Sequence, residues 1–374
     1  MRIKSIEPIA VSLPMLKPVI MAGEEVRRAN NVLVRIQSEN GFVGWGEVAS
    51  APLMTGETLE SIVAAVNYLS PSLCGHDAAD IAGAHRTMNA RMYGNPGAKA
   101  GIDIALHDLC GRAWGKPVHA LLGQKKRDRM PLLGVIGGGD LDGDLRDAVK
   151  KKNSGLTAYK IKVGVDTPEK DAARTRAICG LLGAGVLISA DANQGYTREQ
   201  ALAYIRAVEG SGLDFLEQPV AADDLDGMAA AAMGTQIAIG ADEGIHSIYD
   251  IRRHHERGAA RGVSLKAIKL GGLRSLTDAA RLCDQLGMSV NISCKTGESS
   301  LACAAALQVA SVIPEISWAL TLTHTGLAED VTATPLPAAN GHAEILEKPG
   351  LGIEVDEDRV DRYRVPIAAR GMDC

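Results

Sequence analysis

Apolar and polar residues alternate along the first fifty residues in the manner of half-buried β-strands. The alternation covers residues 3–14 and 31–37, and a period of two is typical of a strand with one face against a core. Asn40-Gly41 follows, a dipeptide favoured in tight hairpin turns, and residues 42–47 continue as a third strand. The pattern predicts a small antiparallel sheet with a loop over residues 18–28 between its first two strands.

Helical periodicity replaces this alternation in the next seventy residues. Apolar residues recur at helical spacing over 58–69 and 97–122. Residues 99–115 are rich in Ala, Leu and Ile, so we expect this helix to be largely buried. Residues 122–129 are basic and polar and are expected to form a solvated linker. The sequence therefore predicts an N-terminal α+β domain over residues 1–125.

From Pro131 onward, short apolar runs alternate with helical segments. The expected strands are residues 132–136, 158–163, 186–191, 215–217, 237–241, 263–266, 289–292 and 316–322. Alternating strands and helices predict a parallel sheet, and eight such units predict a closed (β/α)₈ barrel. We assign the barrel to residues 126–340. Residues 341–374, strand-like near 350–356 and polar beyond, are expected to pack back on the N-terminal domain.

Composition narrows the classes of function. The chain has 374 residues, a net charge of −5 and only 3% aromatic residues, which argues against nucleic acid or an anionic membrane as a partner. No apolar run reaches the length of a membrane span, and the charged first residues do not resemble a signal peptide. Seven cysteines without a CxxC spacing are typical of reduced thiols, so we expect a cytoplasmic protein.

Charged residues recur near the ends of five consecutive expected strands. They are Lys160 with Lys162, Asp191, Glu217, Asp242 and Lys266. The steps from Lys162 to Lys266 are 29, 26, 25 and 24 residues long, close to one βα unit each. Taken singly, each also fits a solvated rim, a helix cap or a turn. Together they predict a site at the C-terminal mouth of the barrel, where barrel enzymes hold their active sites.

The residue types point to proton transfer beside a metal ion. Three buried acids need a cation, and three oxygen ligands favour Mg²⁺ or Mn²⁺ over zinc. Lys160 and Lys162 share one face of a strand, whereas Lys266 comes from beyond the acids, so the lysines would face each other across a substrate. A divalent metal stabilises the enediolate formed when a carboxylate loses its α-proton. A lysine with a lowered pKa can be the base, and Lys160 would lower the pKa of Lys162.

At this point the residues resemble the enolase superfamily, in particular the muconate-lactonising-enzyme subgroup of the mandelate racemase/muconate lactonizing enzyme family. The resemblance rests on Lys-Ile-Lys, Asp-Ala-Asn, Glu-Gln-Pro, Ala-Asp-Glu and Leu-Lys-Ala, and on Gly44-Trp-Gly-Glu and Pro-Gly-Leu-Gly-Ile-Glu-Val at the two ends of the chain. It implies an α/β fold, a modified TIM-like barrel with an α+β capping domain built from the N-terminal segment and the C-terminal tail.

The resemblance also implies a role for each charged residue. The implied metal ligands are Asp191, Glu217 and Asp242. The implied acid/base pair is Lys162 and Lys266, with Lys160 contacting the substrate carboxylate and tuning Lys162. Asn193 and Glu243 are implied to support the ligands from behind.

Specificity, by the same resemblance, belongs to capping loops over residues 17–28 and 49–58 and to the last barrel strands. The candidate substrate-binding residues are Met21, Glu24, Met54, Glu298, Thr321, Thr323 and His324. Dipeptide epimerases of the subgroup carry an Asp-x-Asp pair on the eighth strand to hold a substrate ammonium. Residues 319–325 hold no carboxylate here, which makes a free dipeptide a poorer fit, although Glu24 and Glu25 offer another place for a cation.

The expected function is therefore α-proton abstraction from a small carboxylate, with Mg²⁺ (or Mn²⁺) and without an organic cofactor. We favour a racemase or epimerase of an amino-acid derivative. A cycloisomerase of the muconate type, or a dehydratase, uses the same frame and is the alternative. A non-catalytic scaffold is disfavoured because an idle set of buried charges is destabilising. We expect a homo-oligomer.

Overall fold

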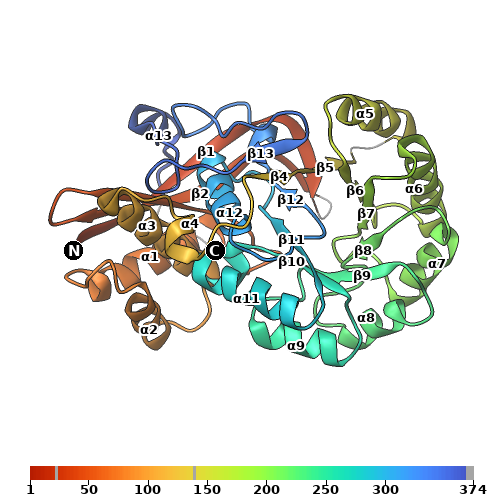
Figure 1. Cartoon of the computed structure of the whole chain (residues 1–374), viewed down its shortest axis with the longest axis horizontal. Coiled ribbons are helices and arrows are strands. Elements are labelled where there is room, and N and C mark those ends of the chain that lie inside the picture. The colour runs from red at the N-terminus through yellow and green to blue at the C-terminus, as the bar shows by residue number, and fades with distance from the viewer. Residues whose placement is uncertain (22–23, 138–139, 368–374) are drawn as a thin grey trace, which may run out of the picture.

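The computed structural model describes residues 1–21, 24–137 and 140–367 and opens with a three-stranded antiparallel sheet (Figure 1). Its strands, in spatial order, are β1 (Ile3–Met21), β2 (Glu24–Ser38) and β3 (Val43–Ala49). The expected loop over 18–28 is wrong: β1 extends to Met21 and β2 begins at Glu24, with Val19 opposite Val26 after a register shift beyond Pro14. Two β-branched residues facing each other favour pairing there.

Four helices follow this sheet along the chain and complete the part of the molecule called the cap below. They are α1 (Leu59–Leu73), α2 (Ile81–Arg91), α3 (Pro96–Trp114) and α4 (His119–Leu122). Of these, α1 and α3 pack directly on the strands. The helix expected over 97–122 ends at Gly115, which has a φ of 64° and is followed two residues later by Pro117. As expected, α3 is buried along most of its length. A Cβ at Gly44 would meet the Ala105 carbonyl oxygen at 2.2 Å, so glycine lets β3 lie directly against α3.

Eight parallel strands form a barrel, as the alternating pattern predicts. They are β5 (Leu133–Ile136), β6 (Ala158–Lys162), β7 (Leu187–Asp191), β8 (Phe215–Glu217), β9 (Ala238–Ala241), β10 (Gly262–Leu265), β11 (Ser289–Ser293) and β12 (Leu320–Thr321). They pair in chain order, and a parallel bridge between Leu132 and Leu320 joins the first to the last. The eighth strand is shorter than expected.

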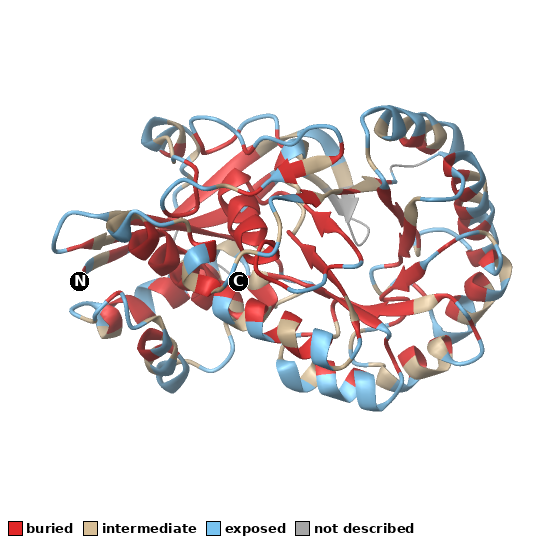
Figure 2. Cartoon of the chain, viewed as in Figure 1, coloured by how far each residue is buried: buried red, intermediate tan, exposed pale blue. Residues whose placement is uncertain are grey.

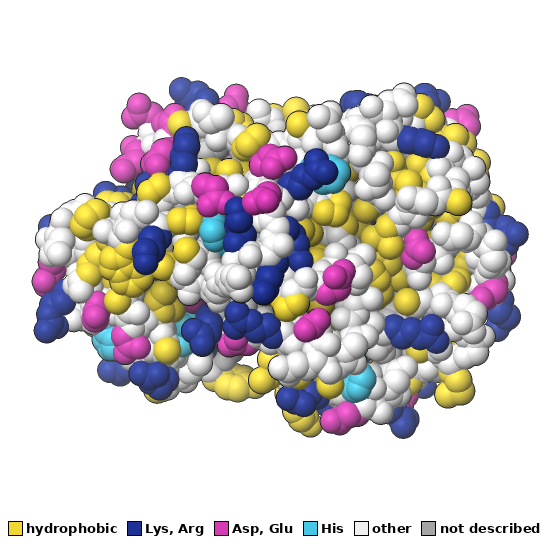
Figure 3. Space-filling view, viewed as in Figure 1, with side chains coloured by type: hydrophobic (Ala, Val, Ile, Leu, Met, Phe, Trp, Pro, Cys, Tyr) yellow, Lys and Arg dark blue, Asp and Glu magenta, His cyan; other side chains and the backbone are white. Residues whose placement is uncertain are grey.

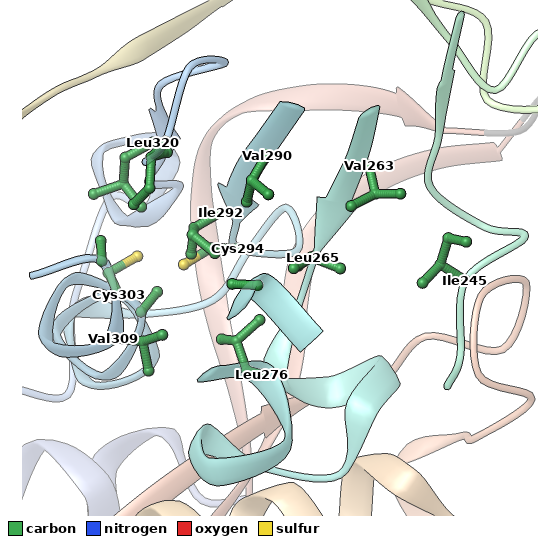
Figure 4. Close-up of a cluster of buried hydrophobic side chains, with 14 of the residues drawn as sticks. Ile245, Val263, Leu265, Leu276, Val290, Ile292, Cys294, Cys303, Val309 and Leu320 are labelled. Carbon is green, nitrogen blue, oxygen red and sulfur yellow. The ribbon is translucent and has the colours of Figure 1, made fainter. Parts of the chain in front are cut away.

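Helices cover the outside of the barrel (Figure 1). They are α5 (Leu141–Asn153), α6 (Pro168–Leu182), α7 (Arg198–Val208), α8 (Leu225–Ala232), α9 (Ile248–Glu256), α11 (Leu273–Gln285) and α12 (Ser300–Ala310), whereas the short α10 (Ala267–Leu270) contacts α3 of the cap. Figure 2 shows buried residues running along the barrel strands, with exposed residues on the outer helix faces. In Figure 4, Leu265 of β10 lies near Leu276 of α11, and Ile292 of β11 lies toward Cys303 and Val309 of α12; all belong to one continuous apolar core.

An aromatic pair fills the barrel interior. The Trp318 ring stacks on Phe215 with 3.8 Å between centroids and 5° between planes. Gly240 and Gly262 make room for it, because a Cβ at these positions would meet Trp318 ring atoms at 2.9 and 2.3 Å. This stack closes the barrel beneath the ends of the strands.

The remaining segments tie the two ends of the chain together. They are β4 (Arg129–Pro131), the 3₁₀ turn η1 (His324–Gly326), β13 (His342–Glu344) and α13 (Glu357–Tyr363), with β13 pairing antiparallel to β4. The expected strand character over 350–356 is wrong: this stretch forms turns and bends with two isolated bridges, Gly350 to Pro117 and Val355 to Thr332. It lies against α3, where Asp108 Oδ1 accepts a 2.8 Å hydrogen bond from the Leu351 amide.

Residues 122–129 connect the cap to the barrel, with Gln124, Lys126, Asp128 and Arg129 exposed as their polarity suggested, but the segment is also anchored by hydrogen bonds. The Arg127 guanidinium donates to the carbonyl oxygens of Ala310 and Pro314, and the Lys126 amide donates to the Ser311 carbonyl at 2.7 Å. These bonds satisfy carbonyl groups at the C-terminal end of α12. The segment is therefore fixed along the barrel by its basic side chains.

The surface carries charges of both signs. Figure 3 shows acidic and basic side chains interspersed over one face. Within the described ranges, the helices lack the combination of length and apolar character needed to cross a membrane.

Candidate active site

The strand-end residues predicted from the sequence meet at one end of the barrel. Lys162 on β6 pairs in register with Asp191 on β7, which pairs with Glu217 on β8. Asp242 follows two residues after Gly240, the partner of Glu217, and therefore leaves the sheet on the same face. Lys266 comes directly after β10. Because β6 and β10 are four places apart in a ring of eight, Lys162 and Lys266 stand on opposite sides of the mouth.

The acids are separated by ammonium groups. Lys160 Nζ lies 2.6 Å from Glu217 Oε2 and 3.8 Å from Asp191 Oδ2, and Lys162 Nζ lies 2.6 Å from the same Asp191 oxygen. Lys266 Nζ contacts both carboxylate oxygens of Asp242. The Lys162 side chain is 38% exposed, whereas those of Lys160 and Lys266 are 5% and 6% exposed. Lys162 is thus the member of this lysine set that faces the opening.

Burial and neighbouring charges shift the acids and bases in opposite directions. Burial disfavours the Lys266 ammonium, but attraction to Asp242 and Glu217 outweighs it and raises the pKa of Lys266. The pKa of Asp242 is lowered in turn, because the attraction of Lys266 and Lys269 overcomes its burial. Burial raises the pKa of Glu217 despite the nearby Lys160. Glu217 is therefore the acid whose charge is least well compensated.

Asn193 and Glu243 lie where residues that support the site would lie. Asn193 Oδ1 accepts a 2.7 Å hydrogen bond from Lys162 Nζ, and its Nδ2 donates to Glu243 Oε1 at 2.9 Å. Its own amide donates to Asp191 Oδ1 at 3.0 Å. Asn193 has a φ of 42°, a conformation that Asn tolerates better than most residues. One side chain thus orients Lys162 and holds Glu243, whose pKa burial raises to about 7.

Lys269 is a member of the cluster that the sequence reasoning missed. Its side chain is fully buried, and its Nζ lies 2.5 Å from Asp242 Oδ1 and donates to the Ser264 carbonyl at 3.0 Å. Burial lowers the pKa of Lys269. A lysine in the apolar run Ala267-Ile-Lys-Leu270 is a signal that could have found it, because a lysine is rarely buried without a partner.

The donor set fits a hard divalent cation. Glu217 Oε1 and Glu243 Oε2 are buried and accept no hydrogen bond in the part of the chain that the structure describes. Buried carboxylate oxygens of this kind are costly unless a cation meets them. Among the described residues, no group of three acids, cysteines or histidines is close enough together to hold a metal ion. The reason is that the lysine ammonium groups lie between the carboxylates. Asp191, Glu217 and Asp242 nevertheless offer oxygen atoms alone, the chemistry that suits Mg²⁺.

The candidate specificity residues divide into three groups. The side chains of Met21 and Glu24, and of Glu25, fall outside the described residues. Met54 lies at the mouth, where its carbonyl oxygen is 2.7 Å from His246 Nε2 in the loop after β9. The His324 side chain is held by other contacts: its Nε2 lies 2.9 Å from the Leu336 carbonyl oxygen, and its ring contacts Cys303.

The other three candidates lie beside β11. Thr321 pairs with Ser293 on the inner face and accepts from Asn291 Nδ2 at 3.3 Å. Thr323 Oγ1 donates to the Lys295 carbonyl oxygen at 2.9 Å. Glu298 is buried, which raises its pKa to about 8, and its Oε2 accepts from the Lys295 amide at 2.8 Å.

A buried acid of the cap, also missed from the sequence, holds the loop after β11 in place. Glu47 on β3 accepts hydrogen bonds from the Ser299 amide at 2.9 Å, the Ser299 hydroxyl at 2.5 Å and the Ala302 amide at 3.0 Å. Asn31 Nδ2 donates to Glu47 Oε1 at 2.7 Å and to the Gly297 carbonyl at 2.8 Å. Glu47 of the cap thereby satisfies amide groups at the N-terminus of α12 and fixes the adjacent loop at the mouth of the barrel.

Comparison with known proteins agrees with this architecture. The model described as "Mandelate racemase / muconate lactonizing enzyme, N-terminal domain" matches residues 6–123, and the one described as "Enolase C-terminal domain-like" matches residues 144–359. Together these two models cover the cap and the barrel from α5 onward, and leave out β4 and β5.

Relatives match over nearly the whole chain. An N-succinyl-L-Arg/Lys racemase of Bacillus cereus is 31% identical and covers 98% of both chains. An L-Ala-D/L-Glu epimerase of Clostridium acetobutylicum is 33% identical over 95% of this chain and 99% of its own. The muconate lactonizing enzyme of Pseudomonas fluorescens, solved with muconolactone, superposes with a TM-score of 0.93 at 30% identity, covering 97% of this chain and 99% of its own. With racemases, epimerases and cycloisomerases as its relatives, the chain belongs to the mandelate racemase/muconate lactonizing enzyme family of the enolase superfamily and is an isomerase.

Proposed function

We propose that this isomerase is a racemase or epimerase that removes and returns the α-proton of an amino-acid derivative. The observation that carries the proposal is the placement of Lys162 and Lys266 on opposite sides of the mouth, with three acids on the strands between them. A substrate lying between two amines has one lysine on each face of its α-carbon. That is the arrangement a two-base inversion requires.

The proton balance is simple. One lysine, as the neutral amine, takes the α-proton and becomes an ammonium group. The opposite lysine, starting as an ammonium group, gives a proton to the other face and becomes neutral. The reverse reaction exchanges the two roles, so the net charge of the site is conserved. Asn193, hydrogen-bonded to Lys162 Nζ at 2.7 Å, would orient one of the two bases.

Asp191, Glu217 and Asp242 would hold Mg²⁺ in this proposal, with Asn193 and Glu243 supporting them. When bound, Mg²⁺ supplies positive charge that stabilises the negative charge developing on the substrate carboxylate. Lys160, buried and in contact with Glu217 and Asp191, would add a fixed positive charge beside the same carboxylate. The chain's own contribution is therefore a set of positive groups around a carbanion-forming substrate.

The inner face of β12 bears on the substrate class. Thr321 occupies that face, and the stretch 319–325 offers hydroxyl groups instead of acids. Such a surface does not compensate a free α-ammonium group, so we propose that the amine of the substrate is acylated. A relative carries "N-succinyl" in its name, which supports the same class.

A screen in deuterated water with Mg²⁺ tests the proposal. N-acyl amino acids, dipeptides, proline derivatives, muconates and acid sugars would be incubated with the enzyme and followed by mass spectrometry and polarimetry. We expect a gain of one deuterium with loss of optical rotation for an N-acyl amino acid. Loss of water or closure of a ring would instead establish the dehydratase or cycloisomerase alternative. Absence of exchange at any α-carbon would contradict proton abstraction on these substrates.

A further inference from the structure

The loop that follows β11 is built into the wall of the mouth. The Cys294 amide donates to the Thr321 carbonyl at 2.9 Å, which extends the β11–β12 ladder by one residue. Thr323 Oγ1 then donates to the Lys295 carbonyl, and Asn31 of the cap donates to the Gly297 carbonyl. Hydrogen bonds from both the barrel and the cap therefore fix the backbone on each side of Lys295.

The alternation of side chains places Lys295 on the inner side of this wall. Figure 4 shows Cys294 on the outer side of β11, facing Cys303 of α12. Ser293, one residue earlier, lies on the inner face opposite Thr321. Side chains of an extended chain alternate, so the residue after Cys294 points to the same side as Ser293. This side is also that of the ammonium groups and acids of the mouth.

Lys295 is a partly buried cation whose ammonium group has no ion pair or hydrogen bond within residues 1–21, 24–137 and 140–367. Burial lowers the pKa of Lys295, and the nearby Glu298 opposes that shift. Burial also raises the pKa of Glu298 to about 8, so this acid is largely protonated at neutral pH and compensates little of the charge. An uncompensated ammonium group in such a place is unfavourable on its own.

We propose that Lys295 is a specificity-determining residue that binds a second negatively charged group of the substrate, a carboxylate remote from the α-carbon. The substrate is then a dianion: one carboxylate lies beside the acids and lysines of the mouth, and the other meets Lys295 under the cap. Thr321 on β12, whose hydroxyl oxygen accepts from Asn291, has a hydroxyl proton suited to the same anion. The inference rests on the proposed function for the position of the first carboxylate.

Matched ligand pairs test the charge directly. The pairs are N-succinyl-L-alanine with its terminal amide, and N-acetyl-L-glutamate with N-acetyl-L-glutamine. Binding would be measured calorimetrically with Mg²⁺, and α-proton exchange in deuterated water. The wild type should bind the dianion of at least one pair about 10-fold more tightly than the amide, as expected for one charge-assisted contact.

A Lys295→Met variant should lose that preference. We expect its affinity for the dianion to fall about 10-fold or more while the affinity for the amide changes less than about 3-fold. Lys116→Met removes the same charge at an exposed position after α3 and serves as the control, with neither affinity changed. Lys295→Arg should keep most of the preference.

Each outcome separates this inference from the proposed function. Equal losses for both members of a pair, or a wild type without charge preference in either pair, would overturn the role of Lys295 even if exchange proceeds. A wild type that prefers the dianion, and a Lys295→Met variant that does not, would support the role of Lys295. If neither protein exchanged an α-proton, the same result would contradict the proton-transfer proposal.

Discussion

Two regions of this molecule bury charged groups, and they treat them differently. At the cap–barrel interface, each oxygen of Glu47 accepts two hydrogen bonds from Asn31, Ser299 or Ala302. At the mouth, Glu217 Oε1 and Glu243 Oε2 accept none among the described side chains. The acids themselves are buried in both regions, with exposed fractions of 0% for Glu47 and Glu217.

The difference indicates that the interface stabilises the fold, whereas the mouth is arranged for binding and catalysis. Fully satisfied buried groups stabilise one arrangement of the chain. Groups left with free lone pairs beside several ammonium groups weaken the fold and are ready to meet a ligand. The contrast predicts that a substitution in the mouth lowers activity and leaves the fold intact, whereas the same chemical change at the interface lowers stability first.

Removing Lys266 should produce the largest effect. In the proposed function Lys266→Ala deletes one of two bases, and general acid–base catalysis contributes up to about 10⁴-fold. We expect turnover to fall about 10³-fold or more, with exchange that starts from one face of the substrate abolished. Thermal unfolding should remain a single cooperative transition, because Asp242 keeps Lys269 as a partner. Full activity toward both enantiomers would exclude the two-base scheme.

Glu217→Gln should come next. It replaces a proposed metal ligand by a neutral isostere, so we expect turnover to fall about 10²-fold together with Mg²⁺ affinity, measured by calorimetry. The free energy of unfolding should change little, because a buried acid with a raised pKa is removed. Metal-saturated Glu217→Gln with normal turnover would contradict the ligand role.

Glu47→Gln makes the same change at the interface and should behave in the opposite way. An amide nitrogen in place of one oxygen faces donors such as the Ser299 amide, so we expect a loss of about 2–4 kcal/mol in urea unfolding. Affinity for Mg²⁺ should stay within a factor of a few of the wild type. An unchanged free energy of unfolding together with a large loss of Mg²⁺ affinity in Glu47→Gln would contradict the distinction between the interface and the mouth.

The smallest effect concerns pH at a second interface site. Asp103 on α3 lies 2.7 Å from His85 Nε2 and accepts from the Leu273 amide at the start of α11. Despite burial, the attraction of Asp103 raises the pKa of His107, while His107 and His85 lower the pKa of Asp103.

The sign follows from these directions. The raised pKa of His107 contributes stability that is present below about pH 6.5 and is lost as pH rises through the folded-state value, and the Asp103 contribution is lost in acid. Wild type should therefore exceed Asp103→Asn in unfolding free energy by more at pH 5.5 than at pH 9, with a difference on the order of 1 kcal/mol. A pH-independent difference between the two proteins would contradict the coupling.

The barrel and its charged row were predictable because each repeats. A buried strand every 25 residues or so and a charged residue at its end form a local pattern, and parallel pairing in chain order then determines which residues meet. The strands β6, β7 and β8 begin or end within a residue of the expected positions.

Other features depend on contacts that a local pattern does not contain. Glu47, Asn31 and Ser299 are far apart in sequence and meet only when the cap lies on α12. The β1–β2 extension past Pro14 required a register shift, and α2 has too few apolar residues to show a clear period. Lys269 was readable in principle, since a lysine inside an apolar run needs a buried partner.

The Trp318–Phe215 stack beneath the mouth limits how this protein can change. Trp318 occupies the space that side chains at Gly240 and Gly262 would need, so the pocket cannot deepen or become shallower without disturbing four positions at once. A loop of the cap, in contrast, meets the mouth through contacts such as that of the Met54 carbonyl oxygen with His246 Nε2. Relatives with this fold can therefore acquire new substrates through changes in the cap loops, while the aromatic stack at the base of the pocket stays constant.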